Sequence, residues 1–443
     1  MILGKIRKII KTRKAEFYFW FPLVFYFSLL FNWNNKTLIA AFLFLIILLT
    51  FKLNKLKEAL FFSFLISIPI SVGKTYIYTL IPSQKLYLPA NPIGYVAKFV
   101  LAPTNIIAIF MLIYLAVKKV KIRLTKELLL ILVLILASFF SVLNSKNFDL
   151  SFLSFLQFTQ LPLIFAFSKY LIKWGGRMEK RLLYIILAQV IFESTFVFLQ
   201  FIKKGPLGHS IEPMLSIVPF GTGADEEFWQ YRPTGTFDHA NIVAAFLIPR
   251  LILIFPKFYK SNNKQINYYL FAFLSGILTL TITLSRSAWL SLIIGILGLS
   301  FYLEKKLKLS FKKVFIRKMA FFLLLFVLIA PFTLIPRIKS SLNTFVQGGS
   351  FVTRVELAKE ALDVIGQNMP LGVGFSMGAV EMFYNNPKGI MYYFPTPVHN
   401  WHLSFILEAG MVALLSLLLL INFAFKIGWR RNKKKMFFIG SFF

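Results

Sequence analysis

The sequence predicts a polytopic, all-helical (all-α) integral membrane protein, and three observations support this fold class. First, 58% of the 443 residues are hydrophobic and only 15% are charged, whereas soluble domains carry about 25% charged residues. Second, the mean hydropathy is +0.72. Third, apolar runs close to bilayer-spanning length recur along the chain, with room for about 12 transmembrane helices of ~20 residues.

Charged residues and Pro, Gly or Asn separate the apolar runs and mark the ends of the expected helices. The expected spans are 17–31, 37–53, 58–73, 94–117, 127–143, 150–172, 182–202, 239–256, 268–285, 287–303, 319–336 and 399–425. The weakest break is at 285–287, where Ser-Arg-Ser alone must turn the chain between two spans. The first span lacks a small-residue cleavage site, so we expect it to be retained.

The charge distribution predicts how these helices are oriented. Fifty Lys and Arg against seventeen Asp and Glu give a net charge of +33, which in a soluble protein would suggest nucleic-acid binding. Here the basic residues concentrate in alternate loops, as the positive-inside rule expects of cytoplasmic segments. We therefore expect both termini in the cytoplasm, attraction to membrane lipids and no nucleic-acid partner.

Two long outer loops divide the chain. We expect N-terminal transmembrane helices over 1–202, an outer loop over 203–238, transmembrane helices over 239–336, a large outer loop over 337–398, and a last transmembrane helix with a basic tail over 399–443.

The second outer loop carries a helical pattern. Thr353-x-x-Glu356 is a capping box, and Gly366 is placed where a helix would stop. Apolar residues recur at helical spacing between these signals, at Phe351, Val355, Ala358, Leu362 and Ile365. The pattern predicts an amphipathic helix from about Arg354 to Ile365 on the outer membrane surface or over a cavity.

The residues suited to chemistry gather on the outer side. The set comprises all four histidines and four arginines: His209, His239, His399, His402, Arg232, Arg286, Arg337 and Arg354. The chain contains no cysteine, which excludes thiolate metal sites and cysteine nucleophiles. It also lacks an Asp-x-Asp pair, so we expect arginine rather than a metal to meet an anionic group, because its fork binds phosphate bidentately.

Three short segments contain most of these residues. They are Arg232-Pro-Thr-Gly-Thr-Phe-Asp-His239-Ala-Asn241, Thr283-Leu-Ser-Arg286-Ser-Ala-Trp289, and Val398-His399-Asn400-Trp-His402 followed by Glu408-Ala-Gly410. A lone Arg286 between two apolar spans needs a reason, although it could simply snorkel and set the depth of the hairpin. His399 has the pKa range of a general base, which we favour over the alternative of a helix-capping or interfacial histidine.

In order and spacing, the three segments resemble the O-antigen ligase family and its polymerase relatives, over about 232–410. Arg354 through Pro370-Leu-Gly-Val-Gly374 is similar to the family's approach to its His-Asn motif. The resemblance implies a GT-C-like fold and lipopolysaccharide biosynthesis at the bacterial inner (cytoplasmic) membrane. It also implies a glycosyltransferase with a periplasmic active site, which moves a glycan from undecaprenyl diphosphate to lipid A-core without a metal or cofactor.

The resemblance also implies roles for individual residues. His399 would be the catalytic base of an inverting single displacement. Arg286 and Arg232 would clamp the diphosphate, with Arg354 and Arg337 as further candidates. The secondary candidates are His239, His402, Asn400 and Asn241.

Several alternatives remain open at this point. A polymerase would use the same donor but pass the chain to a lipid-linked glycan acceptor, and a protein O-oligosaccharyltransferase would share the motifs. A transporter of lipid-linked glycans or a membrane scaffold would belong to another class. Three ionisable residues in expected spans have no assigned role: Glu408 is expected to meet another span, and Lys98 and Glu193 either pair or line a polar cavity.

Overall fold

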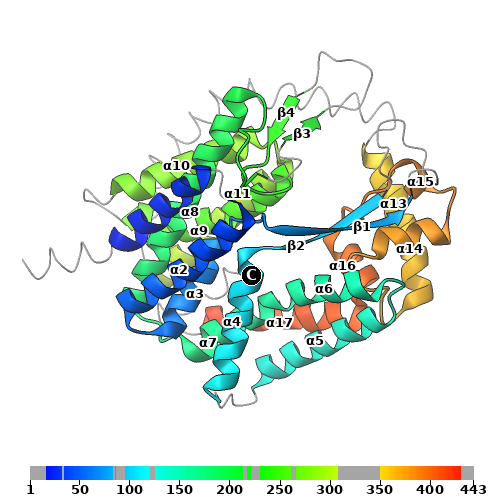
Figure 1. Cartoon of the computed structure of the whole chain (residues 1–443), viewed down its shortest axis with the longest axis horizontal. Helices are drawn as coiled ribbons and strands as arrows, with labels where there is room; N and C mark the ends of the chain where they lie inside the picture. The colour runs from blue at the N-terminus through cyan, green and yellow to red at the C-terminus, as the bar shows by residue number, and fades with distance from the viewer. Residues whose placement is uncertain are drawn as a thin grey trace, which may run out of the picture. The chain divides into compact units, whose positions relative to one another are not determined.

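A computed structural model describes residues 16–31, 34–82, 85, 95–119, 125–212, 217–220, 230–260, 266–307 and 350–430 (Figure 1). The chain forms two compact units. The first unit is built mainly from Met1–Val72 and Lys173–Asn343, and the second mainly from Gly73–Ile172 and Thr344–Ser441. Over the residues described, the fold is mostly helical and contains two small antiparallel sheets.

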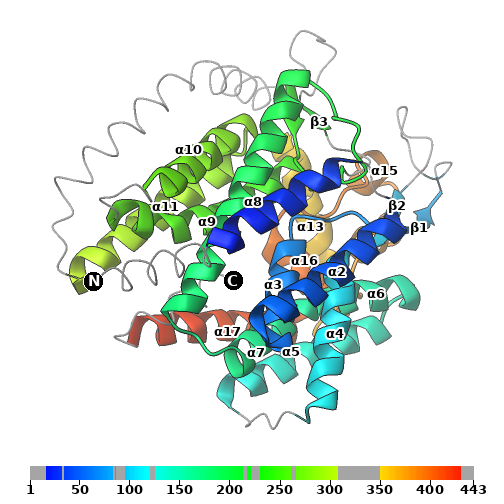
Figure 2. The same cartoon turned by 60° about the vertical axis from the view of Figure 1, so that its left-hand side comes forward.

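The first unit is a helical assembly around one long, largely buried helix. Its elements are a helix within Glu16–Phe31 that ends in η1 (Leu29–Phe31), α2 (Asn35–Leu53), α3 (Leu56–Ser67), α8 (Gly176–Lys203), β3 (Ile217–Phe220), β4 (Gln230–Pro233), α9 (Ala240–Lys260), α10 (Ile266–Ile282) and α11 (Arg286–Leu307). The central helix α8 packs against α3, α9 and α10 (Figure 2). Strands β3 and β4 pair in an antiparallel register, Val218 opposite Arg232.

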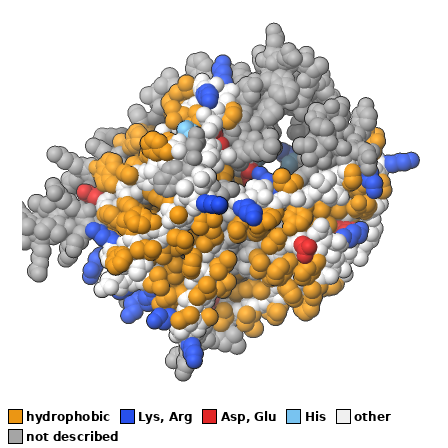
Figure 3. All heavy atoms as spheres, in the orientation of Figure 1, with side chains coloured by type: hydrophobic (Ala, Val, Ile, Leu, Met, Phe, Trp, Pro, Cys, Tyr) orange, Lys and Arg blue, Asp and Glu red, His pale blue; other side chains and the backbone are white. Residues whose placement is uncertain are grey.

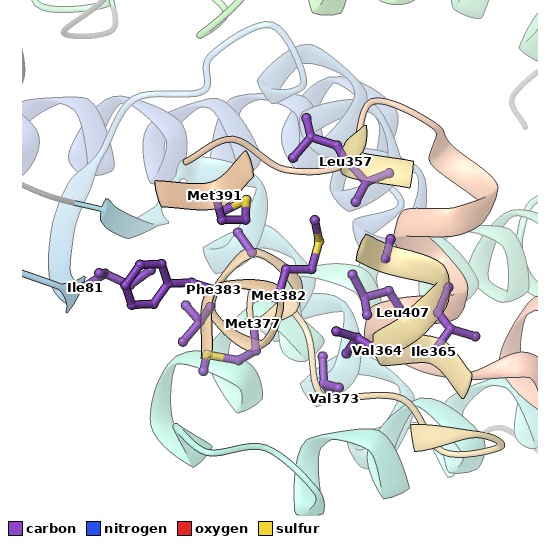
Figure 4. Close-up of a cluster of buried hydrophobic side chains, with 14 of the residues drawn as sticks. Ile81, Leu357, Val364, Ile365, Val373, Met377, Met382, Phe383, Met391 and Leu407 are labelled. Carbon is purple, nitrogen blue, oxygen red and sulfur yellow. The ribbon is translucent and has the colours of Figure 1, made fainter. Parts of the chain in front are cut away.

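The second unit combines a β-hairpin with two groups of helices. Its elements are β1 (Lys74–Ile81), β2 (Tyr95–Leu101), α4 (Pro103–Val117), α5 (Lys126–Leu143), α6 (Phe148–Phe158), α7 (Gln160–Leu171), α13 (Ser350–Asn368), α14 (Gly378–Asn385), α15 (Ile390–Tyr393), α16 (Trp401–Ala409) and α17 (Met411–Arg430). Helix α17 packs along α5, and α13 packs against α14, α15 and α16. Figure 4 shows the core between these shorter helices, where Met382, Val364 and Leu407 are buried together.

Within the described residues, five helices are long and apolar enough to cross a membrane. They are Lys36–Leu53, Lys126–Leu143, Phe148–Leu171, Gly176–Lys203 and Ala240–Lys257. Several shorter helices are also apolar, and large hydrophobic side chains are exposed on many of them (Figure 3). Phe51 of α2, for example, is 83% exposed. Such exposed apolar faces are consistent with a polytopic membrane protein, whose outer helices face lipid.

One expected span is partly wrong. Residues 94–117 do not form one helix, because Tyr95–Leu101 is strand β2, paired antiparallel with β1. Aromatic and β-branched residues fill this strand, and they favour extended structure once a partner strand is available. The helix begins only at Pro103, a residue favoured in the first turn. Lys98 therefore lies on an exposed strand position and not inside a transmembrane helix.

Other expected spans are shorter or interrupted. Helix α3 ends at Ser67, two residues before Pro69, which has no backbone N–H to continue the helical hydrogen bonds. The span at 150–172 corresponds to the membrane-competent stretch Phe148–Leu171, in which a turn at Thr159 separates α6 from α7. The expected span 319–336 lies outside the described residues.

The helix expected at about Arg354–Ile365 is present, but its limits and its buried face differ. Helix α13 runs from Ser350 to Asn368, so the capping box and Gly366 lie inside it, and it ends just before Pro370. The core buries Leu357, Ala361 and Val364 along one face. Two residues of the expected apolar stripe, Val355 and Leu362, are exposed on another face instead.

The last expected span, 399–425, is broken into α16 and α17 at Gly410, whose φ is +85°. The loop before α14 lies against the break. The N–H of Val373 donates to the carbonyl of Leu407 at 2.9 Å, and the N–H of Met411 donates to that of Pro370 at 3.1 Å. The backbone groups freed by the break are thus paired within the protein, as a helix interruption in a membrane requires.

Replacing Gly410 with alanine should destabilise the protein strongly. The added methyl would overlap the Pro370 carbonyl oxygen, and alanine at this φ of 85° and ψ of 168° costs a further ~1–3 kcal/mol, because only glycine normally adopts that region. Gly366→Ala in α13 is the matched control, because a methyl there meets nothing and alanine favours helix by up to ~1 kcal/mol. Thermal unfolding of the two variants in detergent tests this, and equal midpoints would contradict the packing described here.

Candidate functional site

The predicted site residues fall into two groups, one in each unit. The arginine group of the first unit consists of Arg232, His239, Asn241 and Arg286. The histidine group of the second unit consists of Arg354, His399, Asn400 and His402. Arg337 lies outside the described residues.

Arg232 is a buried residue, although the sequence suggests a ligand contact for it. It is the third residue of the short strand β4 and is 6% exposed. Its Nε donates to the carbonyl of Thr283 at 2.9 Å, and its Nη2 donates to Oδ1 of Asn241 at 2.7 Å. One guanidinium therefore joins the first predicted motif to the second.

The second motif is a tight turn followed by a helix. The N–H of Leu284 donates to the carbonyl of Thr281 at 3.1 Å, and Leu284 has a φ of +54°. Arg286, the middle residue of the Ser-Arg-Ser turn that the sequence suggests, is instead the first residue of α11, so the turn lies earlier, at Thr283–Ser285. The Arg286 backbone therefore lies at a helix N-terminus, where the macrodipole favours anions.

His239 and Asn241 mark the start of α9. Nδ1 of His239 accepts a hydrogen bond from the N–H of Asn241 at 3.0 Å, and the His239 carbonyl accepts from the N–H of Ile242 at 2.9 Å. His239 thus caps a helix N-terminus. The side chain of Asn241 is the acceptor for Arg232. Both side chains therefore accept hydrogen bonds from other groups of the first unit.

A network of buried hydrogen bonds fixes the segment between Arg232 and His239. The Glu193 carboxylate accepts from the hydroxyl and the N–H of Thr236, and that hydroxyl also contacts the carbonyl of Pro69. The Gln200 side chain accepts from the N–H of Gly235 at 2.9 Å. Glu193, Thr236 and Gln200 are each fully buried, so this stretch is fixed on α8 by polar contacts.

In the histidine group, Asn400 caps α16. Its Oδ1 accepts from the N–H of His402 at 3.0 Å and from that of Leu403 at 3.3 Å. The His402 ring meets the Trp401 ring edge-on, with centroids 4.6 Å apart. His399 lies outside this helix, two residues before its start.

His399 and Arg354 are 45 positions apart in the sequence but interact electrostatically in the second unit. Partial desolvation lowers the pKa of His399, and the positive charge of Arg354 lowers it further. Arg354 itself is an exposed residue of α13. The imidazole is thus kept neutral, and able to accept a proton, near a cation that attracts anions.

Glu408 has a structural place close to the start of α14. Its carboxylate accepts from the backbone N–H groups of Ser376 and Gly378, and its own carbonyl accepts from the Ser141 hydroxyl at 2.6 Å. The partner of Glu408 is therefore a loop at a helix N-terminus, and not only another span. This arrangement connects α16 to α5 and α14 within the second unit.

Two buried or half-buried polar residues escaped the sequence analysis. Glu360 of α13 accepts from the N–H of Ile390 at 2.8 Å and from the Asn386 amide at 3.0 Å, which shapes the connection from α14 to α15. Arg250 in α9 donates to Gln189 at 3.0 Å and to the carbonyl of Phe246 at 2.7 Å. An arginine within an apolar span is itself a signal, so Arg250 could have been found.

Among the described residues, no group of three or more His, Asp or Glu side chains is arranged to hold a metal ion. What the two groups offer instead is a helix N-terminus at Arg286 and an imidazole of lowered pKa near a guanidinium. Such groups can bind an anion and accept a proton.

In a comparison with protein-family models, residues 271–418 match the family described as O-antigen ligase. The matched range begins within α10 and reaches α17, so it includes Arg286, Arg354 and His399 and excludes Arg232. The comparison with curated proteins gives no match, and neither does the comparison with solved structures.

Proposed function

We propose that this chain is a membrane glycosyltransferase of the ligase type, because residues 271–418 match the family described as O-antigen ligase. In this proposal it transfers a glycan from undecaprenyl diphosphate to lipid A-core on the periplasmic face of the bacterial inner membrane. The observation that carries the proposal is the family match, which covers both Arg286 and His399.

The proposed topology keeps twelve spans with both termini in the cytoplasm. The N-terminal helices over 1–202 precede a periplasmic loop at 203–238, and the helices over 239–336 precede a large periplasmic loop at 337–398. The last span and basic tail follow over 399–443. The five membrane-competent helices and the shorter apolar ones support a multi-pass arrangement.

The leaving group of the proposed reaction is a lipid diphosphate, which gains negative charge as the glycosyl–phosphate bond breaks. In our proposal Arg286 contacts this diphosphate, with Arg354 and Arg337 as further contacts. Arginine suits the task because it stays charged and binds phosphate oxygens bidentately. The position of Arg286 at the start of α11 supports this role, since a helix N-terminus adds favourable potential for an anion.

The acceptor is a sugar hydroxyl, which attacks well only as its proton is removed. In our proposal His399 accepts this proton while the hydroxyl oxygen bonds to the anomeric carbon and the bonding pair leaves on the diphosphate. A single displacement of this kind inverts the anomeric configuration. The lowered pKa of His399 supports a base role, because more of the imidazole is neutral near pH 7.

A reconstituted transfer assay tests the function. The purified protein receives a glycan on undecaprenyl diphosphate, with or without lipid A-core, and products are separated on a gel. A band that requires lipid A-core supports the ligase. A ladder from donor alone would identify a polymerase, and a donor that crosses the bilayer without any product would identify a transporter.

The pH profile of transfer should depend on the positive charge of Arg354, because that charge lowers the pKa of His399. A base works only when neutral, so transfer should fall as the pH drops through the pKa of His399. Arg354 helps to lower that pKa, so Arg354→Gln should raise it and move the acidic limb of the profile to higher pH. Lys359→Gln, which removes an exposed cation from the same helix, is the control. The position of the limb in kcat/KM is the readout, and an unmoved limb in Arg354→Gln would refute this assignment.

A further inference from the structure

The guanidinium group of Arg232 is buried inside the first unit. Its side chain is 6% exposed, and its guanidinium donates in two directions, to the Thr283 carbonyl at 2.9 Å and to the Asn241 amide at 2.7 Å. These two acceptors belong to two different segments, the end of α10 and the start of α9. A fork that bridges two fixed acceptors is a task for arginine, since lysine carries a single ammonium group.

The Thr283 carbonyl, which accepts from Arg232 Nε, lies in the turn that leads into α11. The Thr283 carbonyl precedes Leu284, whose φ of +54° is in the left-handed region. A leucine in that conformation is strained, and it persists only where neighbouring contacts hold it. Two residues later α11 begins with Arg286. Any movement of the Thr283 carbonyl therefore moves the start of α11.

The other side of the bridge is also fixed. Thr236 and Gly235 are held on α8 by Glu193 and Gln200, and a Cβ on Gly235 would collide with the Glu193 carboxylate. Asn241 is held in turn by its N–H bond to His239. The segment 232–241 thus provides a rigid support from which Arg232 reaches the turn at Thr283.

We propose that Arg232 is a positioning residue, which holds the turn at Thr283–Ser285 and so sets the position of the Arg286 backbone at the start of α11. The inference rests on the proposed function, in which Arg286 contacts the diphosphate. It replaces the role that the sequence suggests for Arg232, a direct contact with the diphosphate. The two roles differ in one respect: a positioning residue matters before any substrate is present.

The absence of cysteine from the chain allows a direct test. A single cysteine in place of Ser287, an exposed residue of the first turn of α11, accepts a nitroxide spin label without background. Its spectrum is recorded in detergent without donor or acceptor. In Arg232→Gln and in Asn241→Ala, we expect the label at 287 to become more mobile. A label in place of Ile294, further along α11 and exposed, is the control and should keep its spectrum.

The Asn241→Ala variant guards against loss of the fold, because it removes only the acceptor of Nη2. Unchanged label mobility at 287 in both folded variants would overturn the proposal and return Arg232 to direct contact. Because this measurement uses no substrate, its result is independent of whether the chain is a glycosyltransferase.

An activity measurement tests the same proposal through the reaction. If Arg232 acts through Arg286, Arg232→Gln should lower transfer by about 100-fold, the order of loss expected for misplacement of a reacting group. The double variant Arg232→Gln with Arg286→Lys should then lose little more than Arg286→Lys alone. Losses that multiply would instead mean that the two arginines contact the donor independently.

Discussion

Replacing His399 with alanine should remove nearly all glycan transfer while leaving donor binding intact. In the proposed reaction the imidazole takes the acceptor proton, and a positioned base contributes about 10²–10⁴-fold to a rate. The lowered pKa of His399 is consistent with this role. The measurement is single-turnover transfer with reconstituted protein, together with equilibrium binding of the lipid-linked donor.

His402→Ala is the matched control for this experiment. His402 is another histidine of the same segment, but its ring packs against Trp401 and its N–H belongs to the cap of α16. We expect this variant to keep most of its transfer. If His402→Ala were the inactive one and His399→Ala transferred normally, the base would have to be reassigned to His402.

Replacing Arg286 with lysine should lower transfer on the order of 100-fold, the cost typical of losing one fixed donor to developing negative charge. Lysine keeps the charge but supplies a point charge in place of a planar fork, so it cannot meet two phosphate oxygens together. The rate of transfer and the Kd of the donor should be measured side by side.

The control for Arg286→Lys is Arg181→Lys in the same unit. Arg181 pairs with Glu58 at 3.2 Å, and a lysine can preserve that ion pair, so transfer should be unchanged. Full activity of Arg286→Lys would mean that only charge is needed at this position. Equal loss in both variants would point to a general sensitivity of the fold to arginine replacement.

The sequence predicts the long helices well, because each contains a predominantly apolar run, even where a single charged residue such as Glu193 of α8 or Arg250 of α9 lies within it. Helices α2, α5 and α8–α11 all lie where such runs are found. It misses β2, because the run at Tyr95–Leu101 is apolar in either conformation and only pairing with the distant β1 decides between them. It also misses the break at Gly410, although a glycine just after Glu408 within an apolar span was an available signal.

In the candidate site too, residue types can be recognised in the sequence, whereas contacts with distant partners cannot. The sequence offers Arg232, Asn241 and His399 as candidates by residue type, and the histidine motif lies at the start of a helix as expected. It cannot identify what Arg232 binds, because its partner at Thr283 is a backbone carbonyl, which every residue has. The interaction of Arg354 with His399 is equally hidden, since it depends on how α13 packs in the second unit.

At the break between α16 and α17, the backbones of Gly372 and Gly410 lie in close contact. A Cβ on Gly372 would come within 2.6 Å of the Gly410 nitrogen, and a Cβ on Gly410 would meet the carbonyls of Pro370 and Leu371. A side chain on either glycine would therefore collide with the backbone of the opposite segment. Among proteins that share this junction, we expect both positions to resist change together, because a side chain at either one would require the backbone of both segments to move.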